Sequence, residues 1–214
     1  MENQLNISEI FFGIQGEGRY CGVPALFIRL SGCTRACSWC DTKYHKEGKE
    51  MSFEELNGYI DKYLPETIVW TGGEPLLQFK ELENFLLQRG NFDSRHHIET
   101  NGDLIGKTVG INNLGVFSYI CCSPKDAQTA ENAFKILSSK PHYHMKWDTK
   151  VVTDMFTVGL DMLKYATMLM PQTSGHLQKD AEVRKKVWEY CTENRLRYSP
   201  RLHVEVFGSG KRGV

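Results

Sequence analysis

Short apolar runs alternate with amphipathic segments along most of the chain. Apolar runs closed by turn residues predict buried strands at 25–32, 67–73, 96–102, 117–124 and 166–172. Strands are also expected at 133–140, 144–152 and 201–207, and helices near 52–64, 76–88, 155–164 and 179–194. The first helix opens with a capping box, in which Ser52 and Glu55 bond each other's backbone N–H groups.

Strands that alternate with helices predict a parallel sheet with helical crossovers. In such folds the functional residues gather at the carboxyl ends of the strands. Four predicted strands end in unusual residues, which are Gly-Cys at 32–33, Thr-Gly-Gly-Glu-Pro at 71–75, Glu-Thr-Asn-Gly at 99–102 and Cys-Ser-Pro-Lys at 122–125. We therefore expect one mouth of a barrel-like sheet to collect them.

Composition narrows the class of protein. A chain of 214 residues with 41% hydrophobic content is long enough for one sizeable core, so a single domain over 1–214 is expected. Lys plus Arg equals Asp plus Glu, and this balance argues against a broad polycationic surface for nucleic acid. Neither a long apolar span nor the basic-then-apolar order of a signal peptide is visible, so the expected location is the cytoplasm, away from membranes.

Three of the seven cysteines, Cys33, Cys37 and Cys40, fall within eight residues. Such clustering indicates a soft metal centre more than disulfides in a reducing compartment. A structural zinc site would need a fourth ligand, for which His45 is the only close candidate. Three thiolates on a cubane iron–sulfur cluster instead leave one iron open. S-adenosylmethionine (SAM) chelates that iron in radical SAM enzymes, where an electron from the cluster breaks its C–S bond.

Paired glycines at 72–73 remove side chains where a ligand approaches the backbone. Alone they are typical of an ordinary strand-to-helix turn. About 30 residues after the cysteines, however, they resemble the glycine motif by which radical SAM proteins hold the methionine amino group.

Seven motifs in order along the chain together resemble the 7-carboxy-7-deazaguanine synthase family. They are FFGIQGEG from Phe11, FIRLSGC from Phe27, CSWCDT from Cys37, TGGEPLLQ from Thr71, ETNG from Glu99, SPK from Ser123 and SPRLHV from Ser199. The resemblance implies an α/β fold, a truncated, open (β/α) barrel of the radical SAM type. It also implies a lyase that contracts the ring of 6-carboxy-5,6,7,8-tetrahydropterin to 7-carboxy-7-deazaguanine, with loss of ammonia, in queuosine-type biosynthesis.

The resemblance also implies roles for individual residues. The 4Fe-4S cluster would be held by Cys33, Cys37 and Cys40, and a magnesium ion by Thr42. SAM would be bound by Trp39, Cys40, Asp41, Gly73, Ser123, Pro124, Lys125 and Gln172. The substrate would be bound by Ile14, Gln15, Gly16, Arg29 and Thr71. Expected partners are a flavodoxin-type reductant and a second copy in a homodimer.

The position of Arg29 gives a second reason to assign it to the substrate. It lies four residues before Cys33 on a predicted strand, so the even spacing points both side chains to the same side. A guanidinium there can grip a substrate carboxylate with two hydrogen bonds, and a charge inside an apolar strand needs a buried partner.

Two other classes share part of the pattern. A radical SAM glycyl-radical activase has the cysteine and glycine motifs, but it has no need of IQGEG or of Arg29. A non-catalytic iron–sulfur or zinc-binding module would prefer four protein ligands. The histidines at 96, 97, 142, 144 and 176 match no metal spacing and are interpreted as surface or core residues, whereas His203 could equally face a substrate.

Overall fold

The computed structural model describes residues 3–37, 40, 47–90, 94–139, 146–208 and 211–213. Within these residues the chain builds one nine-stranded sheet of order β3-β1-β2-β4-β5-β6-β7-β8-β9. The strands are β1 (Gln4–Ile14), β2 (Pro24–Leu30), β3 (Lys49–Ser52), β4 (Thr67–Gly72), β5 (Arg95–Thr100), β6 (Tyr119–Cys122), β7 (Lys146–Thr153), β8 (Met168–Pro171) and β9 (Arg197–Tyr198). None of the described helices is long and apolar enough to cross a membrane.

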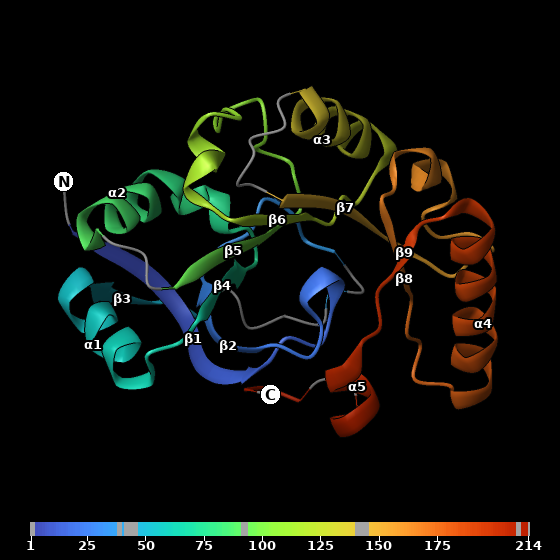
Figure 1. Cartoon of the computed structure of the whole chain (residues 1–214), viewed down its shortest axis with the longest axis horizontal. Helices are drawn as coiled ribbons and strands as arrows, with labels where there is room; N and C mark the ends of the chain where they lie inside the picture. Colours follow the sequence, from blue (N-terminus) through green and yellow to red (C-terminus); the bar gives the residue numbers. More distant parts are fainter. Residues whose placement is uncertain are drawn as a thin grey trace.

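The sheet is an open barrel, as predicted. Each strand from β4 to β9 is parallel to the strand before it in the sheet, and β4 is parallel to β2. β1 runs antiparallel to both of its neighbours, β2 and β3. The end strands β3 and β9 do not pair with each other, so the curved sheet stays open on one side (Figure 1).

The helices cover the outside of the curve. Figure 1 shows α1 (Phe53–Tyr63), α2 (Phe79–Arg89), α3 (Ala127–Ser139) and α4 (Leu177–Asn194) around the convex side, with the short α5 (Leu202–Phe207) at the open side. Four 3-10 turns complete the described part, at Gly18–Tyr20, Pro75–Gln78, Asn113–Val116 and Leu160–Tyr165.

The main core lies between the sheet and these helices. One fully buried side chain from each of four neighbouring strands contributes to it, namely Ile28, Trp70, Ile98 and Ile120. Trp70 meets Phe85 of α2 edge to face, with ring centroids 5.7 Å apart. Because strand side chains alternate between faces, the residues next to these four point to the opposite, inner face of the sheet.

The predicted start of the first helix is confirmed. The Ser52 hydroxyl accepts a hydrogen bond from the Glu55 N–H at 3.2 Å, and the Glu55 carboxylate accepts one from the Ser52 N–H at 2.8 Å. The helix ends at Tyr63, where Leu64 takes a left-handed conformation with φ 43°.

Four element predictions need correction. A strand was expected at 133–140, but 133–139 belong to helix α3, because Ala130, Ala133 and Leu137 present a buried stripe at helical spacing, and residue 140 lies outside the described residues. The expected strand at 201–207 is helix α5, whose Leu202 N–H bonds to the Gly16 carbonyl rather than to a sheet edge. The helix expected at 76–88 is preceded by a 3-10 turn and begins at Phe79.

The helix expected near 155–164 is mostly a turn. The Asp154 carboxylate accepts hydrogen bonds from the backbone N–H groups of Phe156, Thr157 and Val158 at 2.8–2.9 Å. This arrangement satisfies the donors locally, so only the 3-10 turn Leu160–Tyr165 follows.

Candidate functional site

A row of polar side chains lies on the inner face of the sheet near the carboxyl ends of the strands. Strand register places Arg29 beside Thr71 and Glu99 beside Cys121. Lys150 follows on β7, two residues after Asp148, which pairs with Cys121. The alternation that buries an apolar face against the helices therefore lines the concave face with ionic and hydrogen-bonding groups.

Glu99 joins two residues that the sequence assigned to the substrate. Its carboxylate accepts a hydrogen bond from Gln15 Nε2 at 3.0 Å and one from Thr71 Oγ1 at 3.3 Å. Both donors are at least 92% buried, with exposures of 8% and 7%. The sequence interpretation missed Glu99 as a site residue, although its place in ETNG, after a buried strand, was the available signal.

Arg29 has the charged partner that its position required. Its Nε lies 3.2 Å from Glu9 Oε2 on the neighbouring strand β1, and each side chain is 14% exposed. Ile14, at the end of β1, is half exposed at 51%. The arginine thus stands at the mouth already paired with a carboxylate that the sequence did not predict.

Glu17, in the loop after β1, carries the densest set of ionic contacts. Its carboxylate lies 2.5 Å from the Nζ of buried Lys150, 3.2 Å from Arg201 Nε and 3.9 Å from His203 Nε2. Burial by itself would raise the pKa of Glu17, but Lys150 and Arg201 outweigh it and lower the pKa to about 2. The carboxylate is therefore ionised at neutral pH.

Gly16 lies directly against the C-terminal segment. A Cβ at Gly16 would stand 2.4 Å from His203 Nδ1, so only glycine fits this approach. His203 is thereby placed beside two residues of the IQGEG motif, Gly16 and Glu17.

The three predicted cluster ligands lie on one loop after β2, and each is partly buried. The Cys40 N–H donates a hydrogen bond to the Cys37 carbonyl at 3.2 Å. The Arg35 N–H donates to Cys33 Sγ at 3.4 Å, a type of contact that tunes cluster thiolates. Among the described residues, no three Cys, His, Asp or Glu side chains stand close enough to hold a metal ion as they are.

The glycine motif at 71–75 packs on this loop. A Cβ at Gly73 would stand 2.7 Å from Cys33 Cβ, and the Glu74 N–H donates to the Gly32 carbonyl at 2.9 Å. Three soft thiols on one loop, with Cys33 packed against Gly73, have the donor chemistry of an iron–sulfur cluster, although a cluster would need their sulfur atoms closer together than they stand here.

Glu74 is fully buried and ties the glycine motif to the loop after β5. Its two oxygens accept hydrogen bonds from Thr100 Oγ1 at 2.7 Å, Asn101 N at 2.7 Å and Leu76 N at 3.0 Å. Burial raises its pKa to about 7, although the three donors oppose this.

The other predicted SAM residues fall into three groups. Residues 123–125 follow β6, and Ser123 N–H donates to the Thr100 carbonyl at 2.7 Å, which joins this loop to the same network. Gln172 follows β8, where its N–H donates to the Thr153 carbonyl. The predicted residues Trp39, Asp41 and Thr42 lie outside the described residues.

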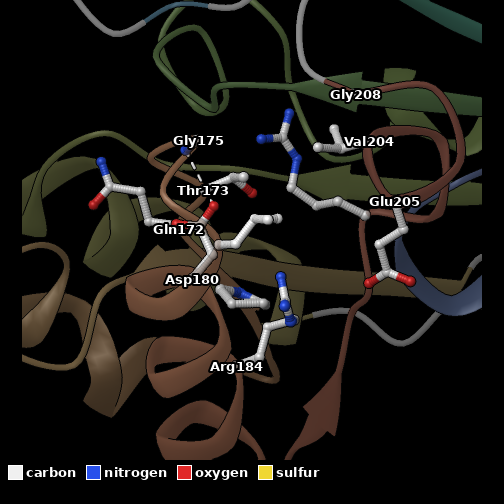
Figure 2. A pocket seen from close by; sticks show the side chains of 11 residues that line it. Gln172, Thr173, Gly175, Asp180, Arg184, Val204, Glu205 and Gly208 are labelled. Atoms are coloured by element: carbon white, nitrogen blue, oxygen red, sulfur yellow. Dashed lines mark hydrogen bonds between the residues drawn. The ribbon is translucent and has the colours of Figure 1, made fainter.

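Gln172 lines a cavity of about 550 Å³ beside the carboxyl end of β8. Figure 2 shows Gln172 and Thr173 on one side of it and Val204, Glu205 and Gly208 on the other. Arg201, which pairs with Glu17, also lines this cavity and so connects it to the ionic groups of the mouth.

Two of the histidines are core side chains, as interpreted from the sequence. His96 Nδ1 accepts a hydrogen bond from Trp70 Nε1 at 3.0 Å, and His97 packs against the rings of Tyr20 and Tyr119. Burial lowers the pKa of each to about 4, so both are neutral at pH 7.

Known proteins share the sequence family and the fold of this chain. The family model described as the Radical SAM superfamily matches residues 27–111. A 7-carboxy-7-deazaguanine synthase of Hyperthermus butylicus is 31% identical over 94% of this chain and 92% of its own length. One of Pyrobaculum aerophilum is 29% identical over 97% of each chain, and one of Bacteroides thetaiotaomicron is 44% identical over 56% of this chain and 60% of its own. The fold resembles the crystal structure of QueE from Escherichia coli, with a TM-score of 0.56 at 22% identity over 94% of this chain and 95% of that one.

Proposed function

The chain belongs to the 7-carboxy-7-deazaguanine synthase family of the radical SAM superfamily, and on this premise we propose that it makes 7-carboxy-7-deazaguanine. The proposed substrate is 6-carboxy-5,6,7,8-tetrahydropterin, whose ring is contracted with release of ammonia. The protein is thus a radical SAM lyase of 7-deazapurine biosynthesis.

One observation carries the proposal. Arg29 and Thr71 are neighbours across β2 and β4, and both strands end in the loops where Cys33 and Gly73 touch. Two residues proposed for the substrate, Arg29 and Thr71, are therefore on the strands that lead into the loops proposed for cluster and SAM. A radical generated at one set would have only a short way to a ligand held by the other.

The chain's own groups match the substrate's polarity. Arg29 is a cation for the substrate carboxylate, with Glu9 holding the guanidinium in place. Glu99 and Gln15 offer an acceptor and an amide to the N–H and C=O groups of a pterin edge. Because Gln15 is buried and Glu99 is partly buried, a ligand that leaves these groups unpaired is disfavoured.

We propose that Cys33, Cys37 and Cys40 hold a 4Fe-4S cluster. Once reduced, this cluster would supply the electron that cleaves SAM. The close packing of Gly73 on Cys33 supports the SAM assignment, because it brings the glycine motif that the family resemblance assigns to SAM beside the first proposed cluster ligand. Residues assigned to SAM by family likeness are Trp39, Asp41, Ser123, Pro124, Lys125 and Gln172, and Thr42 is assigned to a magnesium ion. A single domain, a homodimer, a flavodoxin-type electron donor and a cytoplasmic location complete the proposal.

The test is anaerobic SAM cleavage by the reconstituted protein with dithionite as reductant. We expect 5′-deoxyadenosine to form mainly when 6-carboxytetrahydropterin is present. If the rate of SAM cleavage is the same with and without the pterin but increases with a glycyl-radical partner protein, the result would support an activase instead. A cluster that never cleaves SAM would indicate a non-catalytic module.

A further inference from the structure

Arg35 lies inside the cysteine loop, between Cys33 and Cys37, and reaches two other loops. Its Nε donates to Asp103 Oδ2 at 2.7 Å, and its Nη2 contacts the other oxygen of the same carboxylate. The Nη2 group also donates to Asp126 Oδ2 at 2.5 Å. One guanidinium therefore bridges two carboxylates.

The two carboxylates come from the loops that carry other candidate site residues. Asp103 follows the ETNG stretch after β5, and Asp126 follows residues 123–125, the loop assigned to SAM. Asp126 is itself fixed, because its Oδ1 accepts the Thr129 N–H at 2.8 Å at the start of α3. Arg35 thus joins the cysteine loop to both neighbouring loops.

A second chain of hydrogen bonds supports the same junction. Thr34 Oγ1 donates to Asp103 Oδ2 at 2.7 Å and accepts from Asn101 Nδ2 at 2.9 Å. Asn101 N–H in turn donates to buried Glu74 of the glycine motif at 2.7 Å. The four loops at the mouth are therefore one continuous network in the described part of the chain.

The geometry requires an arginine. Three N–H donors of the Arg35 guanidinium point to two carboxylates. A lysine carries one ammonium group at the end of a flexible chain, so it cannot reproduce this planar, forked arrangement. The Arg35 side chain is 24% exposed and that of Asp103 is 13% exposed, so the pair is partly shielded from solvent. Two carboxylates against one guanidinium leave a net negative charge beside the cysteine loop.

We propose that Arg35 is a positioning residue that sets the distance between the cysteine loop and the loop 123–125, and so controls SAM affinity after the cluster is assembled. This inference rests on the proposed function only in the assignment of cluster and SAM to those two loops.

The test compares Arg35→Lys and Arg35→Gln with wild type and with Arg89→Lys. Arg89 is a matched control, since it is 23% exposed and likewise bridges two side chains, with bonds to Asn57 at 2.5 Å and Asp61 at 2.8 Å on α1. For each protein we would measure the melting temperature without iron, the iron bound per chain, the SAM dissociation constant of the loaded fraction and the cluster reduction potential.

For Arg35→Lys we expect the SAM dissociation constant of the loaded fraction to rise roughly tenfold, since the charge stays but the fork is lost. The cluster potential should be unchanged in this variant. In Arg35→Gln the potential should become more negative, because two carboxylates lose their neutralising charge near the cluster. Arg89→Lys should match wild type in SAM affinity and potential.

A merely structural role predicts a different pattern. In that case the melting temperature and iron content would fall, but the loaded fraction would keep wild-type SAM affinity and potential in both Arg35 variants, and the inference would be wrong. Wild-type protein that binds neither iron nor SAM would instead refute the proposed function.

Discussion

Gly73 and Cys33 are in contact across two loops that are 40 residues apart in the chain. A Cβ at Gly73 would lie 2.7 Å from Cys33 Cβ and 2.2 Å from the Gly32 carbonyl oxygen. Real Cβ atoms do not approach backbone so closely, so a side chain here must displace one of the loops. The packing of the two loops therefore requires glycine at position 73.

We expect Gly73→Ala to lower the iron bound per chain after reconstitution at least severalfold, because the displaced loop carries the first cluster cysteine. Gly58→Ala is the matched control, since its Cβ would meet nothing within 4 Å on helix α1. It should keep wild-type iron content and gain slightly in stability. Full iron loading in Gly73→Ala would contradict the contact.

Arg29→Ala should weaken binding of the carboxypterin by a factor of hundreds, since removing one member of a buried charged pair typically costs ~3–5 kcal/mol. SAM binding should change little. Arg29→Lys should rescue only part of the loss. The lysine keeps the charge, but it lacks the planar fork with which arginine can bind Glu9 and a substrate carboxylate together. Titration of pterin and SAM separately checks this, and a selective loss of SAM binding would move Arg29 to the cofactor site.

The stability that Glu17 contributes should depend on pH in the acid range. Its pKa falls from 4.5 to about 2 on folding, so its contribution is complete above pH 4.5 and is lost as the pH falls toward 2. This shift corresponds to roughly 3 kcal/mol at neutral pH. The free energy of unfolding would be measured with urea from pH 7 to pH 3.5. The difference in this free energy between wild type and Glu17→Gln should narrow only below about pH 4.5.

Glu54→Gln, an exposed change on α1, controls for general acid effects. A gap between wild type and Glu17→Gln that stays constant throughout this pH range would show that Glu17 is not held ionised by Lys150 and Arg201.

Activity should require a divalent ion in addition to iron, because the family resemblance assigns a magnesium ion to Thr42, two residues after the proposed cluster ligand Cys40. Chelation of the reconstituted enzyme should abolish pterin turnover, and added Mg²⁺ should restore it. Thr42→Val should raise the Mg²⁺ concentration needed for half activity, whereas Thr42→Ser should not. Activity that is indifferent to chelation would contradict this assignment.

The sequence predicted the parts of the fold that local patterns determine. The apolar runs that became β2, β4, β5 and β6 and the capping box at Ser52 depend on neighbouring residues, so they were visible in the chain. Helix α3 was not, because a short apolar stretch such as 133–140 fits either period. Strand β1 was also missed, although its length of 11 residues makes it the longest described strand.

Partners distant in sequence could not be predicted in the same way. Gln15 and Glu99 are 84 residues apart, and Glu17 and Lys150 are 133 apart, so only the curved sheet brings them together. The motifs indicated which residues carry chemistry, while the identity of each buried counter-charge came from the fold. Glu9 beside Arg29 illustrates this, since the need for a partner was predictable but the partner was not.

The most direct test of the account is the identity of the product. Anaerobically reconstituted protein would be incubated with SAM, Mg²⁺, reductant and 6-carboxytetrahydropterin, and products would be identified by mass spectrometry, with Cys37→Ala as the inactive control. The account predicts 7-carboxy-7-deazaguanine and ammonia in equal amounts from wild type and neither from the variant. Consumption of SAM with the pterin left intact, or product formed equally by Cys37→Ala, would contradict it.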